Sequence, residues 1–128
     1  MEVLIFENEF VFLETAFNYV NDLFFNKAIN FSVYTKSQDF KSFEKVNKYD
    51  AVIVDISLSV KSDLDGFGIL KKLQSINYSS EKIIVMTGNH KIEESLNEKG
   101  LSNGYDILTK PIEIIALKEF LLKRKKIN

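Results

Sequence analysis

The feature of this sequence that most constrains its fold is a short apolar run that ends in a carboxylate. Residues 51–54 are apolar at every position and rich in β-branched side chains. Such a run is too short for a helix and is typical of a central parallel strand that helices cover on both faces. Asp55 follows directly, at the carboxyl end of the predicted strand. Ligands bind at that edge of open α/β sheets, so Asp55 is the candidate reactive group.

Short apolar runs and amphipathic segments alternate along the rest of the chain. Further strands are predicted at residues 3–6, 28–34, 82–86 and 105–109, and helices at residues 9–25, 38–47, 65–76, 90–99 and 112–123. This alternation with short connections predicts an α/β domain in which helices flank a parallel sheet on both faces. Residues 28–34 alternate in polarity and are expected at a sheet edge. The helix at 90–99 has only Ile92 and Leu96 as apolar anchors and is expected to be loosely held.

Composition and charge exclude several classes of protein. The chain has 128 residues, of which 45% are apolar and none is cysteine, so one core can form without disulfide bonds. A net charge of −1 creates no overall attraction to nucleic acid or anionic lipid. No basic leader precedes the first strand, and no apolar run approaches the ~20 residues that span a bilayer. We expect a cytoplasmic protein in which residues 1–128 form a single domain.

Three other features are interpreted as structural. Phe10, Phe17 and Phe24 recur at helical spacing and are expected in the core. The basic residues 123–126 are expected to be a solvated helix C-terminus, where cations complement the helix dipole, because no second basic patch supports nucleic-acid binding. His90 is the sole histidine and has no partner cluster, so we assign it no role.

Polar side chains follow four of the predicted strands. They are Glu7 and Asn8, Asp55, Thr87 and Lys110. Crowded acids bind a hard divalent cation, a lysine opposite them neutralises an added anion, and a hydroxyl donates a hydrogen bond to it. This combination suits phosphoryl transfer to a carboxylate, which is ionised at neutral pH and depends on positioning and charge neutralisation. A strand-end aspartate alone is more often a turn former or a helix cap, so the hypothesis depends on the whole set.

Short motifs surround these polar residues. They are Glu7-Asn8, Asp55 with Leu58 and Asp65-Gly66-Phe67, Thr87-Gly88, and Lys110-Pro111. In this order they resemble the receiver domain of bacterial response regulators, the CheY-like family, over almost the whole chain. The resemblance implies a doubly wound, flavodoxin-like (βα)5 fold with a five-stranded parallel sheet. It also implies a signalling phosphoprotein of a two-component system rather than an enzyme with independent turnover.

The resemblance further implies how the phosphoryl group is received. Asp55 would accept it from a histidine kinase or phosphotransfer protein in a phosphorelay, or from a small phosphodonor. Mg²⁺ would be held by Glu7, Asn8, Asp55 and the main-chain carbonyl of Ser57. Asp55 would thus be both acceptor and metal ligand.

The remaining site residues would stabilise and report the phosphoryl group. Thr87 and Lys110 would each contact a phosphoryl oxygen, and the Lys110–Pro111 peptide bond would be cis. Movement of Thr87, with Ile107 at the switch position, would reshape the surface formed by the fourth helix, the fifth strand and the fifth helix. A downstream protein partner would bind there.

Three positions depart from the family pattern. Asn8 replaces the acid that normally touches the metal, so weak Mg²⁺ binding is expected. Ser59 stands in the usual place of proline, and residues 60–64 lengthen the loop, which changes access of the phosphodonor. Ile107 replaces the switch aromatic and lacks a hydroxyl, while Tyr105 lies two residues earlier on the same face of the strand.

These departures leave a second interpretation open. A degenerate pseudo-receiver would keep the fold, take no phosphate and act as a phosphorylation-independent interaction module through the same surface. The intact Asp55, Thr87 and Lys110 oppose that interpretation. A phosphatase of the haloacid-dehalogenase type is excluded, because Ser57 occupies the place of its second acid. We expect a monomer or weak dimer with no direct contact to nucleic acid or membrane.

Overall fold

The computed structural model describes residues 1–102 and 104–127. Its strands are β1 (Glu2–Phe6), β2 (Asn30–Tyr34), β3 (Ala51–Asp55), β4 (Ile83–Thr87) and β5 (Asp106–Thr109). Its α-helices are α1 (Glu14–Phe24), α2 (Gly66–Ser75), α3 (Ile92–Glu98) and α4 (Ile114–Ile127), and short 3₁₀ helices are η1 (Phe10–Phe12), η2 (Ser37–Asp39), η3 (Phe43–Lys48) and η4 (Ser80–Lys82). In the described ranges the strands form one parallel five-stranded sheet in the order β2-β1-β3-β4-β5. The predicted doubly wound α/β fold is confirmed.

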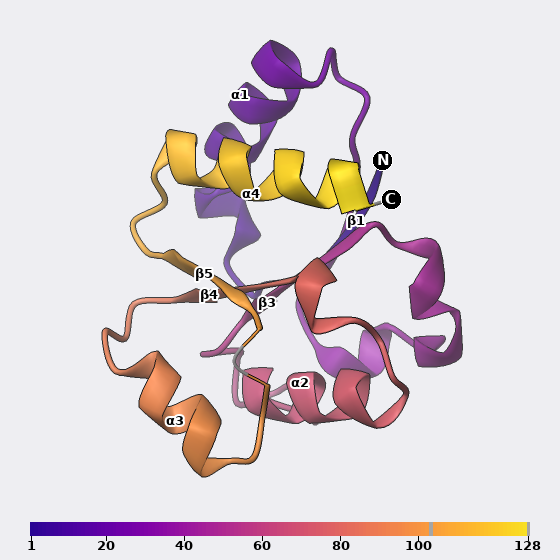
Figure 1. Ribbon diagram of the computed structural model, residues 1–128, viewed down its shortest axis with the longest axis vertical. Coiled ribbons are helices and arrows are strands. Elements are labelled where there is room, and N and C mark those ends of the chain that lie inside the picture. Colours follow the sequence, from indigo (N-terminus) through magenta and orange to yellow (C-terminus); the bar gives the residue numbers. More distant parts are fainter. Residues whose placement is uncertain (103, 128) are drawn as a thin grey trace.

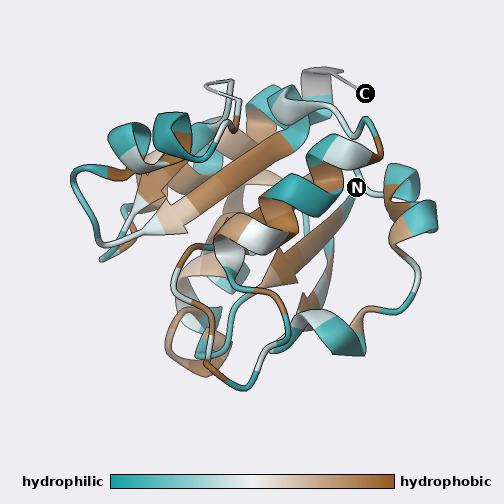
Figure 2. Ribbon diagram, turned by 90° about the horizontal axis from the view of Figure 1, so that it is seen from below, coloured by the Kyte–Doolittle hydropathy of each residue, from teal (hydrophilic) through white to brown (hydrophobic). Residues whose placement is uncertain are grey.

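Helices cover both faces of the sheet (Figure 1). α1, α4 and η1 pack on one face, and α2, α3 and η3 pack on the other. Val52 and Val54 of β3 join the cluster beneath α2, whereas Ala51 and Ile53 join the cluster beneath α1, because successive side chains of a strand point to opposite faces. Both faces of the central strands are therefore apolar, and Figure 2 shows these strands in the hydrophobic colour.

The strand order creates a crevice between β1 and β3. β1 pairs with β2 on one side and with β3 on the other, so the direction in which strands are added reverses between them. In doubly wound sheets this switch point opens at the carboxyl ends of the strands. Glu7 follows β1 and Asp55 ends β3, which places both acids at the opening.

The connection between β2 and β3 differs from the α-helix expected at residues 38–47. η2 and η3 stand there instead, separated by an extended Phe40 with φ −92° and ψ 99°. Phe40, Phe43 and Val46 recur every three residues. Residues three apart are neighbours on an α-helix as well as on a 3₁₀ helix. The spacing therefore predicts a helix but does not distinguish the two forms.

The expected core row of phenylalanines is only partly right. Phe17 is fully buried and Phe10 is half-buried against the same cluster. Phe24 was expected in the core, but it is 39% exposed and has the Lys118 ammonium 4.8 Å from its ring centroid. The predicted helix at 9–25 begins as η1 and becomes α-helical only at Glu14. Phe24 is the last residue of α1, and the next residue, Phe25, is buried in the core instead.

The expected solvated C-terminus is wrong for Arg124, which is fully buried. Its guanidinium donates to the Asp106 carboxylate and, at 3.0 Å, to the carbonyl oxygen of Ile83. Lys123 Nζ lies 3.1 Å from Asp106 Oδ2. Position 124 is three residues after the buried Leu121 and so falls on the inward face of α4. The basic run thus contains two residues that bind the sheet, of which only Arg124 is buried.

The predicted edge position of the strand at residues 28–34 is confirmed, because β2 lies at one edge of the sheet. The predicted apolar anchors of the helix at 90–99 are confirmed too, because α3 buries only Ile92 and Leu96.

Of the helices in the described ranges, none is both long enough and apolar enough to cross a membrane.

Candidate functional site

Sheet pairing brings the carboxyl ends of β3, β4 and β5 together. Asp55 pairs in register with Met86, so Thr87 lies one residue farther along β4. The Ile56 amide donates to the Met86 carbonyl at 3.0 Å, and the Lys110 amide donates to the Thr87 carbonyl at 2.9 Å. The backbone therefore positions Asp55, Thr87 and Lys110 along a single edge.

The Lys110 ammonium lies between two acidic side chains. Its Nζ is 3.0 Å from Glu7 Oε1 and 3.3 Å from Oε2, and it is 3.4 Å from Asp55 Oδ2. Glu7 is 1% exposed and Asp55 is 3% exposed, while the Lys110 side chain is 29% exposed. The Lys110–Pro111 peptide bond beyond it is cis. Side chains from three distant parts of the sequence thus meet, with the lysine facing solvent.

Two carboxyl groups share one ammonium, so the cluster is under-compensated. Burial raises the pKa of Glu7 to about 7, and its hydrogen bond to Asp55 acts in the same direction, although Lys110 opposes both. Burial disfavours the Lys110 ammonium, but its hydrogen bond to Glu7 and the acidic charges outweigh this and raise the pKa of Lys110. An added cation would favour the ionised form of Glu7. The electrostatics therefore suit cation uptake.

Backbone amides orient the oxygen atoms of Asp55 and Thr87. The Ser57 amide donates to Asp55 Oδ1 at 3.0 Å, and the Asn89 amide donates to Thr87 Oγ1 at 2.9 Å. Thr87 is 2% exposed. A hydroxyl that accepts a hydrogen bond still carries its own proton, so Thr87 is able to donate to an anionic oxygen placed beside it.

The groups predicted to hold a cation are all oxygen donors. They are the carboxylates of Glu7 and Asp55, the amide oxygen of Asn8, and the carbonyl of Ser57. Such hard donors fit Mg²⁺. Asn8 is half-buried and uncharged, and within the described ranges no group of three or more His, Cys, Asp or Glu residues could hold a metal ion. The residues fit Mg²⁺ by donor type, but with little negative charge.

The start of α2 packs directly against the carboxyl end of β3. A Cβ atom at Gly66 would lie 2.4 Å from Ile56 Cα and 2.5 Å from the Asp55 carbonyl oxygen, closer than real atoms approach. Asp65 caps the helix by accepting a hydrogen bond from the Gly68 amide at 2.7 Å. The Asp-Gly pair therefore holds the backbone after Asp55, a role that the sequence analysis did not assign.

The lengthened loop after β3 is held by the turn after β2. The Ser37 amide donates to Ser62 Oγ at 2.8 Å, and the Leu64 amide donates to Ser37 Oγ at 2.9 Å. Gln38 Oε1 accepts from the Asp63 amide at 2.9 Å. The partners are 25 to 27 residues apart and are ordinary polar residues of two loops. No pattern in the sequence could have revealed this contact.

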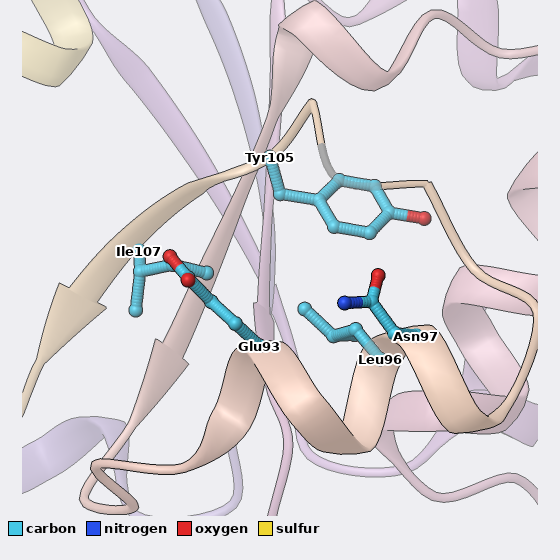
Figure 3. Close-up of a pocket in the computed structure, with 5 residues that line it drawn as sticks. All are labelled: Glu93, Leu96, Asn97, Tyr105 and Ile107. Carbon is cyan, nitrogen blue, oxygen red and sulfur yellow. The ribbon is translucent and has the colours of Figure 1, made fainter.

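A cavity of about 260 Å³ lies between α3 and β5 (Figure 3). It is lined by Glu93, Leu96, Asn97, Tyr105 and Ile107. The Tyr105 ring extends over Leu96 and Asn97, while Ile107 lies beside Glu93. Burial raises the pKa of the Tyr105 phenol. Ile107, the predicted switch residue, therefore lines a cavity between β5 and α3.

The profile of the response regulator receiver domain family matches residues 3–122. The chain belongs to this family. Receiver domains are signalling modules of two-component systems rather than classical enzymes. The matched range contains every strand end that carries a predicted site residue. The comparison with curated proteins found no match.

Solved structures of receiver domains share the fold. The receiver domain of the Francisella response regulator 1452 is 22% identical with a TM-score of 0.65, covering 99% of this chain and 98% of its own. The receiver domain of merR from Colwellia psychrerythraea 34H is 19% identical with a TM-score of 0.74, covering 98% of each chain. The receiver domain of the sensor histidine kinase PA1611 from Pseudomonas aeruginosa PAO1 is 23% identical with a TM-score of 0.69, covering 95% of this chain and 94% of its own. At these identities the likeness shows the fold alone.

Proposed function

We propose that this receiver domain is a phosphoacceptor module of a two-component phosphorelay and that Asp55 takes the phosphoryl group. The observation that carries the proposal is the contact of Lys110 with Glu7 and Asp55 at the crevice between β1 and β3. A strand-end aspartate that served only as a turn former would not require a buried acid and a lysine beside it. The arrangement matches what phosphoryl transfer needs, which is a nucleophile with a neutralising cation.

The transfer step conserves charge and atoms. A carboxylate oxygen of Asp55 forms the new P–O bond while the P–N bond of a phosphohistidine breaks, and the electron pair leaves with the imidazole, which then takes up a proton. The Lys110 ammonium neutralises one phosphoryl oxygen, and the Thr87 hydroxyl donates to another. A small phosphodonor would react in the same way with its own leaving group.

Mg²⁺ is proposed to bind through Glu7, Asn8, Asp55 and the carbonyl of Ser57. When bound, it would neutralise charge on the phosphoryl oxygens. The receiver domain of PA1611 is described with a magnesium ion coordinated in its active site cleft. Here the neutral Asn8 predicts weak binding, because an amide oxygen attracts the cation less than a carboxylate does.

The Mg²⁺ proposal is tested by titration with detection of the backbone amide shifts near Asp55. Asn8→Asp should tighten binding by about tenfold, the effect of one added charge near a cation, and Asn8→Ala should weaken it. Equal Mg²⁺ affinity in the wild type and both variants would remove Asn8 from the proposed ligands.

Exposed apolar side chains flank the acidic site and suit a protein donor. Val11 and Phe12 on η1 are 72% and 78% exposed, and Ile115 at the start of α4 is 61% exposed. Both segments follow strands that end at the site, η1 after Glu7 and α4 after Lys110. We propose that the histidine-bearing domain of the donor packs on them. Phe12→Ser should then slow transfer from a protein donor but leave transfer from acetyl phosphate unchanged.

The proposed output surface consists of α3, β5 and α4, which correspond to the fourth helix, fifth strand and fifth helix predicted from the sequence. The Lys110 amide donates a hydrogen bond to the Thr87 carbonyl and so joins the end of β4 to the end of β5. A movement of Thr87 would therefore displace the end of β5. Because Ile107 has no hydroxyl, its coupling to Thr87 would run through packing in the cavity beside α3. A downstream protein would recognise the changed surface.

The central experiment is incubation with acetyl phosphate or beryllofluoride in the presence of Mg²⁺. We expect one added phosphoryl mass on Asp55, and no modification in Asp55→Asn. If the wild type also fails to respond to a phosphorylated kinase, the interaction-module interpretation replaces the phosphoacceptor proposal.

A further inference from the structure

A second cavity, of about 360 Å³, lies between the end of β2, η2 and η3. Lys41, Lys45 and Lys48 line it together with a single acid, Asp39, and all three lysines are exposed. Within the described residues, no carboxylate lies at ion-pair distance from any of these lysines. In a protein with a net charge of −1, this is a local excess of positive charge around a hollow.

Aromatic side chains form the apolar part of the same cavity. Tyr34, Phe40 and Tyr49 line it. The ring centroids of Tyr34 and Phe40 are 5.2 Å apart, and those of Phe40 and Tyr49 are 6.1 Å apart. Phe40 and Tyr49 are almost fully buried, while Tyr34 is half-buried. Their mutual packing makes this wall rigid, in contrast to the flexible lysine side chains above it.

We propose that this cavity binds a small ligand that joins a phosphate group to a planar ring, of which a nucleoside monophosphate is the simplest example. Lysine ammonium groups bind phosphate as point charges, and a planar ring packs favourably against aromatic side chains. The cavity volume is within the range of ordinary small-molecule sites. The proposal goes beyond the phosphoacceptor function and uses none of the residues assigned to it.

The cavity is near the acidic site but separable from it. The Tyr34 carbonyl accepts a hydrogen bond from the Glu7 amide at 3.1 Å, so the two sites occupy neighbouring strands of the same edge. A phosphate compound could therefore bind at either place. Measurements in EDTA with the Asp55→Asn variant of the 128-residue chain remove the metal-dependent site and leave this cavity intact.

The first test is a titration of the ¹⁵N-labelled chain with adenosine monophosphate, followed by amide chemical shifts. We expect saturating shifts at residues 34 and 40–49, with a dissociation constant of about 0.1–1 mM. Adenosine lacks the phosphate and inorganic phosphate lacks the ring, so each should bind at least several-fold more weakly. Raising the salt concentration from about 0.05 to 0.5 M should weaken binding, because exposed charges are screened.

The second test removes the positive charge. The combined variant Lys41→Gln, Lys45→Gln and Lys48→Gln should lose about tenfold or more in affinity, the sum of three exposed ionic contacts. The matched control Lys71→Gln, Lys91→Gln and Lys125→Gln makes the same change of charge on exposed lysines elsewhere and should stay within about twofold of the parent. If the combined variant fails to fold, Lys45→Gln alone is compared with Lys71→Gln alone.

Three results would overturn the proposal. These are no shifts at residues 34 and 40–49 up to about 10 mM nucleotide, equal affinity for inorganic phosphate and the nucleotide, or equal loss of affinity in the cavity variant and its control.

Discussion

Two clusters of charged side chains lie at opposite ends of the strands. The cluster that contains the proposed phosphoacceptor, called the acceptor cluster, consists of Glu7, Asp55 and Lys110 at the carboxyl ends. The structural cluster consists of Asp106, Lys123 and Arg124 at the amino ends of β4 and β5. The acceptor cluster has two acids and one cation, whereas the structural cluster has one acid and two cations. The pKa of Glu7 in the acceptor cluster is raised, whereas the pKa of Asp106 in the structural cluster is lowered.

The difference separates a cluster that holds the fold from the cluster proposed to accept the phosphoryl group. Burial alone would raise the pKa of Asp106, but hydrogen bonds from Arg124 and Lys123 outweigh it and lower that pKa, so this carboxylate is satisfied. Burial and the neighbouring Asp55 raise the pKa of Glu7 to about 7, and Lys110 only partly offsets them. A satisfied cluster has no use for a further ligand, while an under-compensated one is improved by a cation.

The largest expected effect comes from breaking the structural cluster. Arg124→Ala leaves the Ile83 carbonyl and the Asp106 carboxylate without the guanidinium, so the free energy of unfolding should fall by about 3–5 kcal/mol. Denaturant titration measures this. Lys125→Ala, an exposed neighbour, should change stability by about 0.5 kcal/mol or less. Equal losses in the two variants would mean that the buried arginine contributes nothing specific.

Breaking the acceptor cluster should affect chemistry more than stability. Lys110→Gln removes the charge that neutralises a phosphoryl oxygen, so the rate of phosphorylation by acetyl phosphate should fall by about 10²-fold. Its loss of unfolding free energy should be smaller than that of Arg124→Ala, because Glu7 can take up a proton instead. Lys71→Gln serves as the exposed control. An unchanged phosphorylation rate in Lys110→Gln would contradict the role of this lysine.

The raised pKa of Glu7 predicts a pH dependence of stability in EDTA. The folded protein binds this proton more tightly than the unfolded chain, so the contribution of Glu7 is fully present below about pH 4.5 and is lost as the pH rises to about 7. The unfolding free energy of Glu7→Gln relative to the wild type should therefore increase over that window, by about 1–3 kcal/mol. Glu9→Gln, an exposed neighbour, should show a smaller change. A difference that does not vary with pH would refute the under-compensated cluster.

The lowered pKa of Asp106 predicts the opposite slope in acid. Its contribution to stability is present above the ordinary value of 3.8 and is lost as the pH falls through the lower folded value. In Asp106→Asn, the unfolding free energy should fall less steeply between about pH 5 and 2, by about 1 kcal/mol or less in total. Denaturant titration at several pH values measures this. Asp22→Asn, on an exposed position of α1, is the control. An acid limb that is equally steep in both variants would exclude Asp106 as its source.

The sequence predicted the acceptor cluster better than the structural one. Glu7, Asp55 and Lys110 each follow an apolar run, and parallel strands necessarily align their carboxyl ends, so local pattern was enough to bring them together. Arg124 stands in a basic run whose pattern resembles a solvated helix end. Its burial depends on the face that α4 turns to the sheet, which is a property of packing.

Loop structure was equally hard to predict. The hydrogen bond from the Ser37 amide to the Ser62 hydroxyl joins two polar loops. Neither loop has a periodic sequence pattern that would predict this contact. The 3₁₀ form of η3 differs from the predicted α-helix, and the spacing of Phe43 and Val46 does not distinguish the two forms because residues three apart share a face in both. Local periodicity thus identifies elements and their ends, whereas contacts between loops need the assembled structure.

The sequence by itself determined the strands, the two apolar faces and the polar residues at their ends, because the period of a strand and the length of an apolar run are local properties of a chain. Only the tertiary structure decided how charge is balanced around those residues. Burial and neighbouring ions set whether a carboxylate is satisfied or poised for a ligand, and both depend on side chains that the fold brings from distant positions.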